Sequence, residues 1–270
     1  MTDKRRPPLM AYENRQFLNK RDGRPLRILS EYLEPQSRFD HHDIVDTIVF
    51  MGSARFVARE EAERELAAAG SDADARRAQT KLETSFYYEA ARDLAERLTI
   101  WSKELNDEEH RYVVCTGGGP GIMEGANRGA SQARGMNIGM AISIPSEQTF
   151  NQYITRELAF HFHYFFMRKF WLAYLAKAVI FFPGGFGTLD EMFELLTLLK
   201  TGKITKHLPV VLFGREYWRE VINFEALVRH GTIDREDLEI FIMTDSVDEA
   251  FEFITSELRQ ATPMEKGPTL

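Results

Sequence analysis

The sequence predicts an α/β protein: a single domain with a doubly wound, Rossmann-like parallel sheet and helices on both faces. Three observations support this fold class. Short apolar runs alternate with helical segments, glycine-rich turns follow several of those runs, and no repeat, low-complexity tract or linker interrupts the pattern. In such folds the turns gather at the carboxyl edge of the sheet, where ligands bind. These turns are therefore the predicted site.

The composition predicts a soluble, cytoplasmic globular protein. The chain has 270 residues, of which 44% are hydrophobic and 28% charged, so a sizeable core is feasible. The net charge of −7 argues against a nucleic-acid-binding surface. A single cysteine, Cys115, excludes an intramolecular disulfide and a multi-cysteine zinc site, and it fits a reducing compartment.

The chain is expected to divide into an N-terminal extension (1–45), the Rossmann-like domain (46–260) and a C-terminal tail (261–270). The basic start lacks an apolar region, so no signal peptide is predicted, and no apolar run approaches the roughly 20 residues of a membrane span. The first 25 or so residues are predicted to be a mobile tail or a packing arm. A capped helical turn after them is expected to end near Pro35.

The first strand is predicted at 47–51, and Gly52-Ser53-Ala54-Arg55 closes it. Small residues followed by an arginine are able to hold a phosphate, which makes Ser53 a candidate substrate contact. An ordinary strand-to-helix turn is the equal alternative. Residues 59–105 are helical in pattern, with a break at 70–72, and the apolar stripe of the second segment predicts core packing.

The second strand, predicted at 111–115, leads into Thr116-Gly-Gly-Gly-Pro-Gly121. Consecutive glycines let the backbone approach a ligand closely, so Gly118 and Gly119 are candidate contacts. The spacing is not GxGxxG, and no acidic residue ends the next strand to hold a ribose, so a NAD site is weakly supported. Cys115 has no obvious base beside it and is predicted to be a buried strand residue.

A polar loop follows the third predicted strand, 137–144. This loop, 145–151, has side chains able to bind a base or a sugar, and Glu147 is its candidate contact. Further on, His161 and His163 form an H-x-H pair, but no third ligand is near in sequence. We therefore predict packed or surface histidines and no metal site.

The helix predicted at 164–174 is aromatic on all sides, which favours burial, including burial between subunits. Arg168 and Lys169 would be costly to bury without partners. Two interpretations stay open. The pair reaches solvent at the surface, or it meets a buried acid or a substrate anion, which is the interpretation we favour.

The most informative motif is Pro183-Gly-Gly-Phe-Gly-Thr-Leu-Asp-Glu191. It lies between a buried apolar strand at 178–182 and an amphipathic helix. Glycines let the backbone turn, and a helix N-terminus favours an anion such as phosphate. Asp190 and Glu191 place carboxylates beside that anion site. The combination predicts chemistry on a phosphorylated substrate.

The rest of the chain completes the alternation of strands and helices. Strands are predicted at 208–213 and 238–243, and helices at 216–230 and 246–258. Ser246 is the expected N-cap of the last helix, because Glu249 three residues later completes a capping box.

Three motifs together resemble the Lonely Guy (LOG) family: Thr116–Glu124, Arg168–Lys169 and Pro183–Glu191. This family comprises cytokinin-activating phosphoribohydrolases and nucleotide 5′-monophosphate nucleosidases, with a Rossmann-like fold and at least dimeric assembly. The resemblance covers roughly residues 45–260. Relatives are often labelled lysine decarboxylases; nothing in the sequence supports pyridoxal phosphate chemistry, and we reject that function.

The resemblance implies roles for individual residues. Arg168 and Glu191, 23 positions apart, would be the catalytic pair. Lys169 would lie near the 5′-phosphate, Thr197 would contact the substrate, and Glu147 would correspond loosely to a ligand-contacting acid. The phosphate would be held by the turn residues Gly184, Gly185, Phe186, Gly187 and Thr188.

The resemblance implies a nucleotide-binding hydrolase that cleaves AMP or a cytokinin riboside 5′-monophosphate into free base and ribose 5-phosphate. It would need no cofactor and no metal, act as a homodimer or larger homo-oligomer, and bind neither nucleic acid nor membrane. The alternative is a non-catalytic nucleotide or molybdenum-cofactor carrier, since the same turn would bind phosphate there. A dinucleotide oxidoreductase is the weakest hypothesis. The N-terminal extension departs from the plant-type enzymes and leaves the base preference open.

Overall fold

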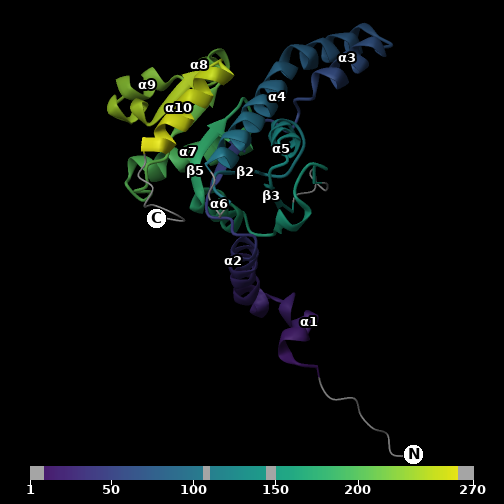
Figure 1. Cartoon of the computed structure of the whole chain (residues 1–270), viewed down its shortest axis with the longest axis vertical. Helices are drawn as coiled ribbons and strands as arrows, with labels where there is room; N and C mark the ends of the chain where they lie inside the picture. The colour runs from purple at the N-terminus through teal and green to yellow at the C-terminus, as the bar shows by residue number, and fades with distance from the viewer. Residues whose placement is uncertain (1–8, 106–109, 144–149, 261–270) are drawn as a thin grey trace, which may run out of the picture.

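Seven parallel strands form one sheet in the computed structural model of the chain, which describes residues 9–105, 110–143 and 150–260 (Figure 1). The strand order is β4-β3-β2-β1-β5-β6-β7. Strands β1, β2, β5 and β6 are buried along their whole length, as apolar parallel strands covered on both faces should be. The strands are β1 Thr47–Met51, β2 Val113–Thr116, β3 Asn137–Ile142, β4 Ala159–Phe162, β5 Ala176–Phe181, β6 Val210–Phe213 and β7 Phe241–Thr244.

Helices cover both faces of the sheet. One core, which contains Ile48 and Phe50, packs under α4, α5 and α10; the other, which contains Val49 and Met51, packs under α2, α6 and α7. Successive residues of β1 thus supply opposite cores. No helix within the described ranges has the length and apolarity to cross a membrane. The α-helices are α1 Arg15–Leu18, α2 Arg24–His41, α3 Arg59–Ala67, α4 Asp72–Glu104, α5 Ile122–Gln132, α6 Phe165–Tyr174, α7 Phe186–Lys200, α8 Arg215–Val221, α9 Phe224–Arg229 and α10 Val247–Gln260.

The winding of the chain reverses at β1, which pairs with β2 on one side and β5 on the other. The loops that follow these strands are bonded together. The Ser53 N–H donates to the Pro183 carbonyl at 2.9 Å, and the Ile122 N–H donates to the Ser53 carbonyl at 3.0 Å. The predicted doubly wound fold is confirmed, and its reversal point is where such sheets bind ligands.

Two predicted elements near the C-terminus have different limits. The segment predicted as a helix at 216–230 is two helices, α8 and α9, because the Asn223 side chain accepts a hydrogen bond from the Ala226 N–H and caps a new helix. The strand predicted at 238–243 begins at Phe241, since a 3₁₀ helix occupies Glu236–Ile240.

Helix α2 runs through Pro35, where the sequence predicted a helix end. Proline has no N–H to donate to the carbonyl four residues earlier, which belongs to Glu31. The indole N–H of Trp171 on α6 donates to that carbonyl instead, at 3.0 Å. The predicted helix end was wrong because the replacement donor is 140 positions away in the sequence.

Candidate active site

Arg168 on α6 and Glu191 on α7 form a buried ion pair. Arg168 Nη2 lies 2.7 Å from Glu191 Oε1, and the two side chains are 12% and 9% exposed. Helix α6 follows β4 and α7 follows β5, so both helices begin at the carboxyl edge of the sheet. The fold therefore brings into contact the two residues that the LOG resemblance marks as catalytic.

Burial and Arg168 act on the pKa of the Glu191 carboxyl in opposite directions. Burial raises the pKa of Glu191 above its ordinary value of 4.5, while the charge of Arg168 and its hydrogen bond lower it. Arg168 also has one N–H group that makes no hydrogen bond among the described residues, and this group, at Nε, is buried. A ligand oxygen would satisfy that donor.

The turn after β5 presents bare backbone to open space. Helix α7 begins at Phe186, so the N–H groups of its first turn have no acceptor inside the helix. A side chain at Gly185 or Gly187 would meet no atom within 4 Å, and neither glycine has a positive φ. Neither packing nor backbone conformation requires glycine at these positions. Close approach of a ligand to the backbone is the explanation that fits.

Two further contacts fix this turn. A Cβ on Gly184 would lie 2.2 Å from Thr188 Oγ1, so packing requires glycine there. The Gly184 carbonyl accepts a hydrogen bond from the Tyr217 hydroxyl on α8 at 2.5 Å. Sequence reasoning missed Tyr217, because it lies 33 positions away in a helix that carries no motif.

A pocket of about 710 Å³, the glycine-turn pocket, joins these groups. Its walls come from the loops after β1, β2 and β5 and from α6 and α8. The side chain of Phe186, 92% exposed, stands at its mouth. The predicted contacts in its lining are Ser53, Arg168, Gly184, Gly185, Phe186, Gly187 and Thr188.

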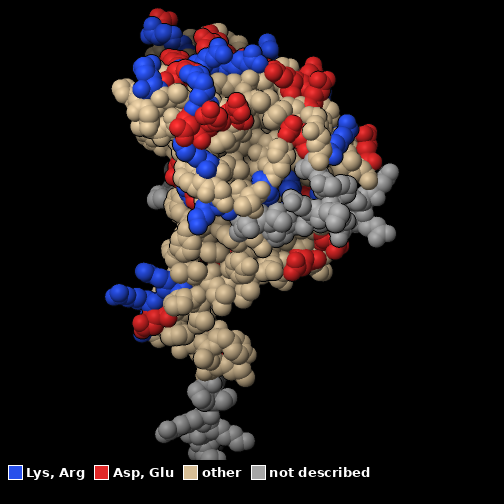
Figure 2. Space-filling model, turned by 90° about the vertical axis from the view of Figure 1, so that its left-hand side faces the viewer, with Lys and Arg blue, Asp and Glu red and all other residues tan. Residues whose placement is uncertain are grey.

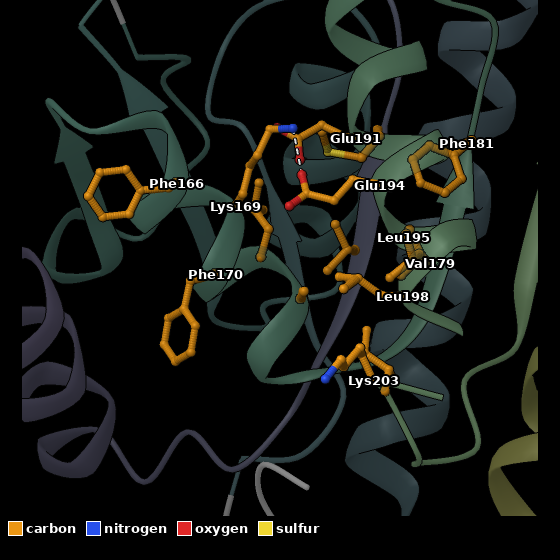
Figure 3. A pocket seen from close by; sticks show the side chains of 15 residues that line it. Phe166, Lys169, Phe170, Val179, Phe181, Glu191, Glu194, Leu195, Leu198 and Lys203 are labelled. Carbon is orange, nitrogen blue, oxygen red and sulfur yellow. Dashed lines mark hydrogen bonds and ion pairs between the residues drawn. The ribbon is translucent and has the colours of Figure 1, made fainter. Parts of the chain in front are cut away.

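A second cavity of about 480 Å³, the apolar pocket, lies between α6 and α7 (Figure 3). Phe170, Phe181 and Leu198 are among the side chains that line it. Glu191 borders this pocket, whereas Arg168 borders the glycine-turn pocket. The ion pair therefore stands between a cavity with bare backbone N–H groups and a cavity with apolar walls.

Lys169 and Thr197 lie outside the glycine-turn pocket. Lys169 Nζ is 2.7 Å from Asp190 Oδ2 and 2.5 Å from Glu194 Oε2. Thr197 Oγ1 donates to the Phe193 carbonyl at 2.7 Å. Lys169 and Thr197 both border a shallow pocket beside α7. Lys169 thus neutralises two carboxylates in this structure, and its contact with a phosphate stays a prediction.

Gly118 and Gly119 shape their own loop. Gly118 has a φ of +76°, which favours glycine, and the Asn151 side chain donates to the carbonyls of Gly118 and Gly119 at 3.3 and 3.1 Å. Among the three consecutive glycines at 117–119, Gly117 is the one that lines the glycine-turn pocket. The remaining candidate, Glu147, lies outside the described residues.

A family model described as "Possible lysine decarboxylase" matches residues 123–254. That stretch contains Arg168, Glu191 and the glycine turn that leads from β5 into α7. Over those residues the chain is similar to this family. It is the LOG family of the sequence-based prediction, whose members often carry the lysine decarboxylase label. Among curated proteins, no match to this chain was found.

Several solved structures are similar to the chain. The X-ray structure of TM1055 has 19% identity and a TM-score of 0.48, and the match covers 78% of this chain and 99% of that one. The molybdenum cofactor binding protein of the phototrophic bacterium Rippkaea orientalis has 17% identity and a TM-score of 0.48, with 79% and 98% covered. The Moco carrier protein of Chlamydomonas reinhardtii has 19% identity and a TM-score of 0.45, with 80% and 99% covered. Similarity at this level assigns no activity.

Proposed function

We propose that this protein hydrolyses the N-glycosidic bond of a nucleoside 5′-monophosphate, either AMP or a cytokinin riboside 5′-monophosphate, and releases the free base and ribose 5-phosphate. The observation that carries the proposal is the buried Arg168–Glu191 pair beside a bare helix N-terminus. The helix end suits the 5′-phosphate, and the carboxylate suits the cationic sugar of the transition state. One substrate molecule would use both.

Binding would begin with the phosphate. The first-turn N–H groups of α7 and the helix dipole favour an anion at Gly185 and Gly187, where open space meets bare backbone. Arg168 would bind the ribose or the phosphate through its unpaired Nε. With the phosphate anchored, C1′ would face Glu191, and positioning of this kind contributes several kcal/mol to catalysis.

The bond that breaks joins C1′ to the base. The base leaves with the electron pair of the C–N bond and takes a proton from the solvent, and C1′ passes through an oxocarbenium-like state. The Glu191 carboxylate would stabilise that positive charge, or take a proton from the water that attacks C1′. Arg168 would orient the carboxylate, and its charge lowers the pKa of Glu191 against the larger effect of burial. The chain would act in the cytoplasm as a homodimer or a larger homo-oligomer.

A panel of substrates tests this function. The protein is incubated with AMP, other nucleoside monophosphates and the corresponding nucleosides, and free base and ribose 5-phosphate are quantified by chromatography. We expect equimolar base and ribose 5-phosphate from at least one monophosphate and none from its nucleoside. No base from any monophosphate would contradict the proposal. A nucleotide or molybdenum cofactor that co-purifies and stays intact on prolonged incubation would instead support the carrier alternative.

A further inference from the structure

A cluster of buried polar side chains lies beside the triple-glycine loop, residues 117–119, and the proposed reaction does not use it. On the face shown in Figure 2, basic and acidic side chains lie intermixed over the upper part of the molecule, where single charge pairs stabilise little. Polar groups in the interior are different, because each must be hydrogen-bonded or it costs free energy. The members of the cluster, each at most 9% exposed, are Thr116, Asn127, Asn137 and Asn151.

Asn127 on α5 is the centre of the cluster, and its amide makes four hydrogen bonds. Its Oδ1 accepts from the Thr116 hydroxyl at 2.7 Å and from Asn151 Nδ2 at 2.9 Å. Its Nδ2 donates to Asn137 Oδ1 at 2.8 Å and to the Ile138 carbonyl at 3.2 Å. Every donor and acceptor of the amide is therefore used. One helix is bonded in this way to β2, to β3 and to the segment that contains Asn151.

The cluster holds the triple-glycine loop from two sides. On one side, the Thr116 hydroxyl accepts a hydrogen bond from the Gly118 N–H at 2.9 Å. On the other side, the Asn151 N–H donates to the Gly118 carbonyl at 3.0 Å, and the Asn151 side chain donates to the carbonyls of Gly118 and Gly119. Both backbone groups of Gly118 are thus bonded to the cluster, so the loop has little freedom to move.

The loop in turn borders the guanidinium of Arg168. Gly117 and Arg168 both line the glycine-turn pocket. A Cβ on Gly117 would lie 3.8 Å from Arg168 Nη1 and 2.8 Å from Met123 Sδ. The other terminal nitrogen of the guanidinium, Nη2, lies 2.7 Å from Glu191 Oε1. The backbone of the loop therefore limits where the guanidinium can lie on its Nη1 side.

Packing of this kind matters for an arginine. A hydrogen bond at Nη2 fixes one nitrogen, and a guanidinium bonded there can still swing about that nitrogen. The neighbours on its other sides then decide where Nε and Nη1 lie. One neighbour is the Phe165 ring, whose centroid is 5.7 Å from Arg168 Cζ, and another is Gly117.

We propose that the buried cluster positions Arg168: through the triple-glycine loop, it keeps the guanidinium on Glu191. Thr116 is the positioning residue with the most direct part, because its hydroxyl is bonded to the Gly118 N–H and to Asn127. A loop released from this hydroxyl would give the guanidinium room to turn away from the carboxylate. The kinetic consequence rests on the proposed function, whereas the placement of the guanidinium can be measured without a reaction.

Substitutions at Thr116 test the proposal. Thr116→Val keeps the shape of the side chain but leaves the Gly118 N–H without its acceptor, and Thr116→Ser keeps the hydroxyl. In protein with isotopically labelled glutamate carboxyl groups, NMR follows the titration of Glu191, whose signal is the one missing from Glu191→Gln. We expect the midpoint to lie at higher pH in Thr116→Val and to match wild type in Thr116→Ser, since a displaced Arg168 lowers the pKa of Glu191 less.

Two controls separate positioning from a general loss of packing. Thr99→Val removes another buried threonine hydroxyl, which donates to the Ala95 carbonyl within α4, and it should leave the midpoint unchanged. In an Arg168→Met background, Thr116→Val should no longer move the midpoint, because the residue through which it acts is gone. The other charged groups that act on this carboxyl, Lys169 on α6 and Glu194 on α7, are present in both backgrounds.

A second variant covers the case in which Thr116→Val does not fold, as judged by circular dichroism. Asn151→Ala removes the side-chain bonds to the loop carbonyls and should move the midpoint of Glu191 in the same direction. Equal midpoints in wild type and the folded variant, or the same shift in the Arg168→Met background, would overturn the inference.

Base release from AMP gives the kinetic consequence. We expect kcat/KM to fall about tenfold in Thr116→Val and to stay within about twofold of wild type in Thr116→Ser and Thr99→Val. A fall of the same size in Thr116→Ser would contradict the role of the hydroxyl. A wild-type protein that releases no base from any monophosphate contradicts the proposed function, and the titration of Glu191 then decides the inference by itself.

Discussion

Arg168 Nη2 lies 2.7 Å from Glu191 Oε1, at the boundary between the glycine-turn pocket and the apolar pocket. Burial alone would favour a protonated Glu191, and the guanidinium opposes that effect. The arginine therefore has two tasks in the proposed reaction. It lowers the pKa of the Glu191 carboxyl against the effect of burial, and it would offer its own Nε to a substrate oxygen.

Replacing Glu191 should remove catalysis and leave the protein folded. We expect Glu191→Gln to lower kcat for base release by about a thousandfold, since the amide cannot stabilise a cationic sugar or take a proton. Glu194→Gln is the matched control. It lies one turn further along α7, is 42% exposed and pairs with Lys169, and its activity should stay within about threefold of wild type. Equal rates for Glu191→Gln and wild type would remove this carboxylate from the mechanism.

The pH dependence should report the opposing effects of burial and Arg168. If ionised Glu191 is required, kcat/KM falls on the acid side with a midpoint above 4.5, because burial raises the pKa of Glu191. Arg168→Met removes the charge that lowers this pKa, so the midpoint should move to still higher pH in the residual activity. Rate profiles of both proteins check the direction. A shift toward acid would contradict the assignment.

Tyr217 should act on substrate affinity through the turn it holds. In Tyr217→Phe the Gly184 carbonyl loses a hydrogen bond of 2.5 Å, and the turn loses a constraint. We expect KM for the monophosphate, and the inhibition constant of ribose 5-phosphate, to rise about fivefold with little change in kcat. Tyr174→Phe, a hydroxyl removed far along α6, is the control. A fall in kcat at constant KM would point to a different role.

Motifs allowed the core of the site to be predicted from sequence. Arg168, Glu191 and the turn between strand and helix each stand in a recognisable pattern, and the parallel sheet brings them to one edge. Cys115, predicted to be a buried strand residue, lies in β2 with no exposed surface, and burial raises the pKa of its thiol.

What could not be predicted depends on partners distant in sequence. Tyr217 on α8 donates a hydrogen bond to the turn. Lys169 forms ion pairs with Asp190 and Glu194 on α7. Local sequence rules also predicted a helix end at Pro35. They could not include the hydrogen bond from Trp171, because that residue is distant in the sequence. Tertiary contacts of this kind override local rules.

Lys206 should make stability depend on pH. Its Nζ is buried and donates to the carbonyls of Ala173 and Tyr174, each at 2.8 Å. Burial lowers the pKa of Lys206 to about 7, with Lys177 adding to the effect and Asp46 opposing it. The unfolded chain keeps the ordinary value of 10.5, so it binds more protons than the folded chain between pH 7 and 10.5. The free energy of unfolding should therefore rise with pH across that window.

Urea denaturation at both ends of the window measures this effect. We expect Lys206→Met to remove about 2–4 kcal/mol of the rise, while the exposed control Lys203→Met keeps it. Other groups titrate in the same range, so the comparison is between the slopes of the variants and wild type. Identical slopes in Lys206→Met and wild type would show that the buried lysine stays charged in the folded protein.

A double-mutant cycle should reveal how α2 tolerates its proline. Trp171→Phe removes the indole donor and leaves the Glu31 carbonyl without a hydrogen bond, because Pro35 has none to give. In a Pro35→Ala background, the new N–H at position 35 completes the helical bond to that carbonyl. Trp171→Phe should then cost about 1–2 kcal/mol less stability than it does beside the proline, with the lost ring volume common to both backgrounds. Unfolding free energies of the four proteins give the coupling. A value near zero would mean that the indole is not what satisfies the carbonyl freed by Pro35.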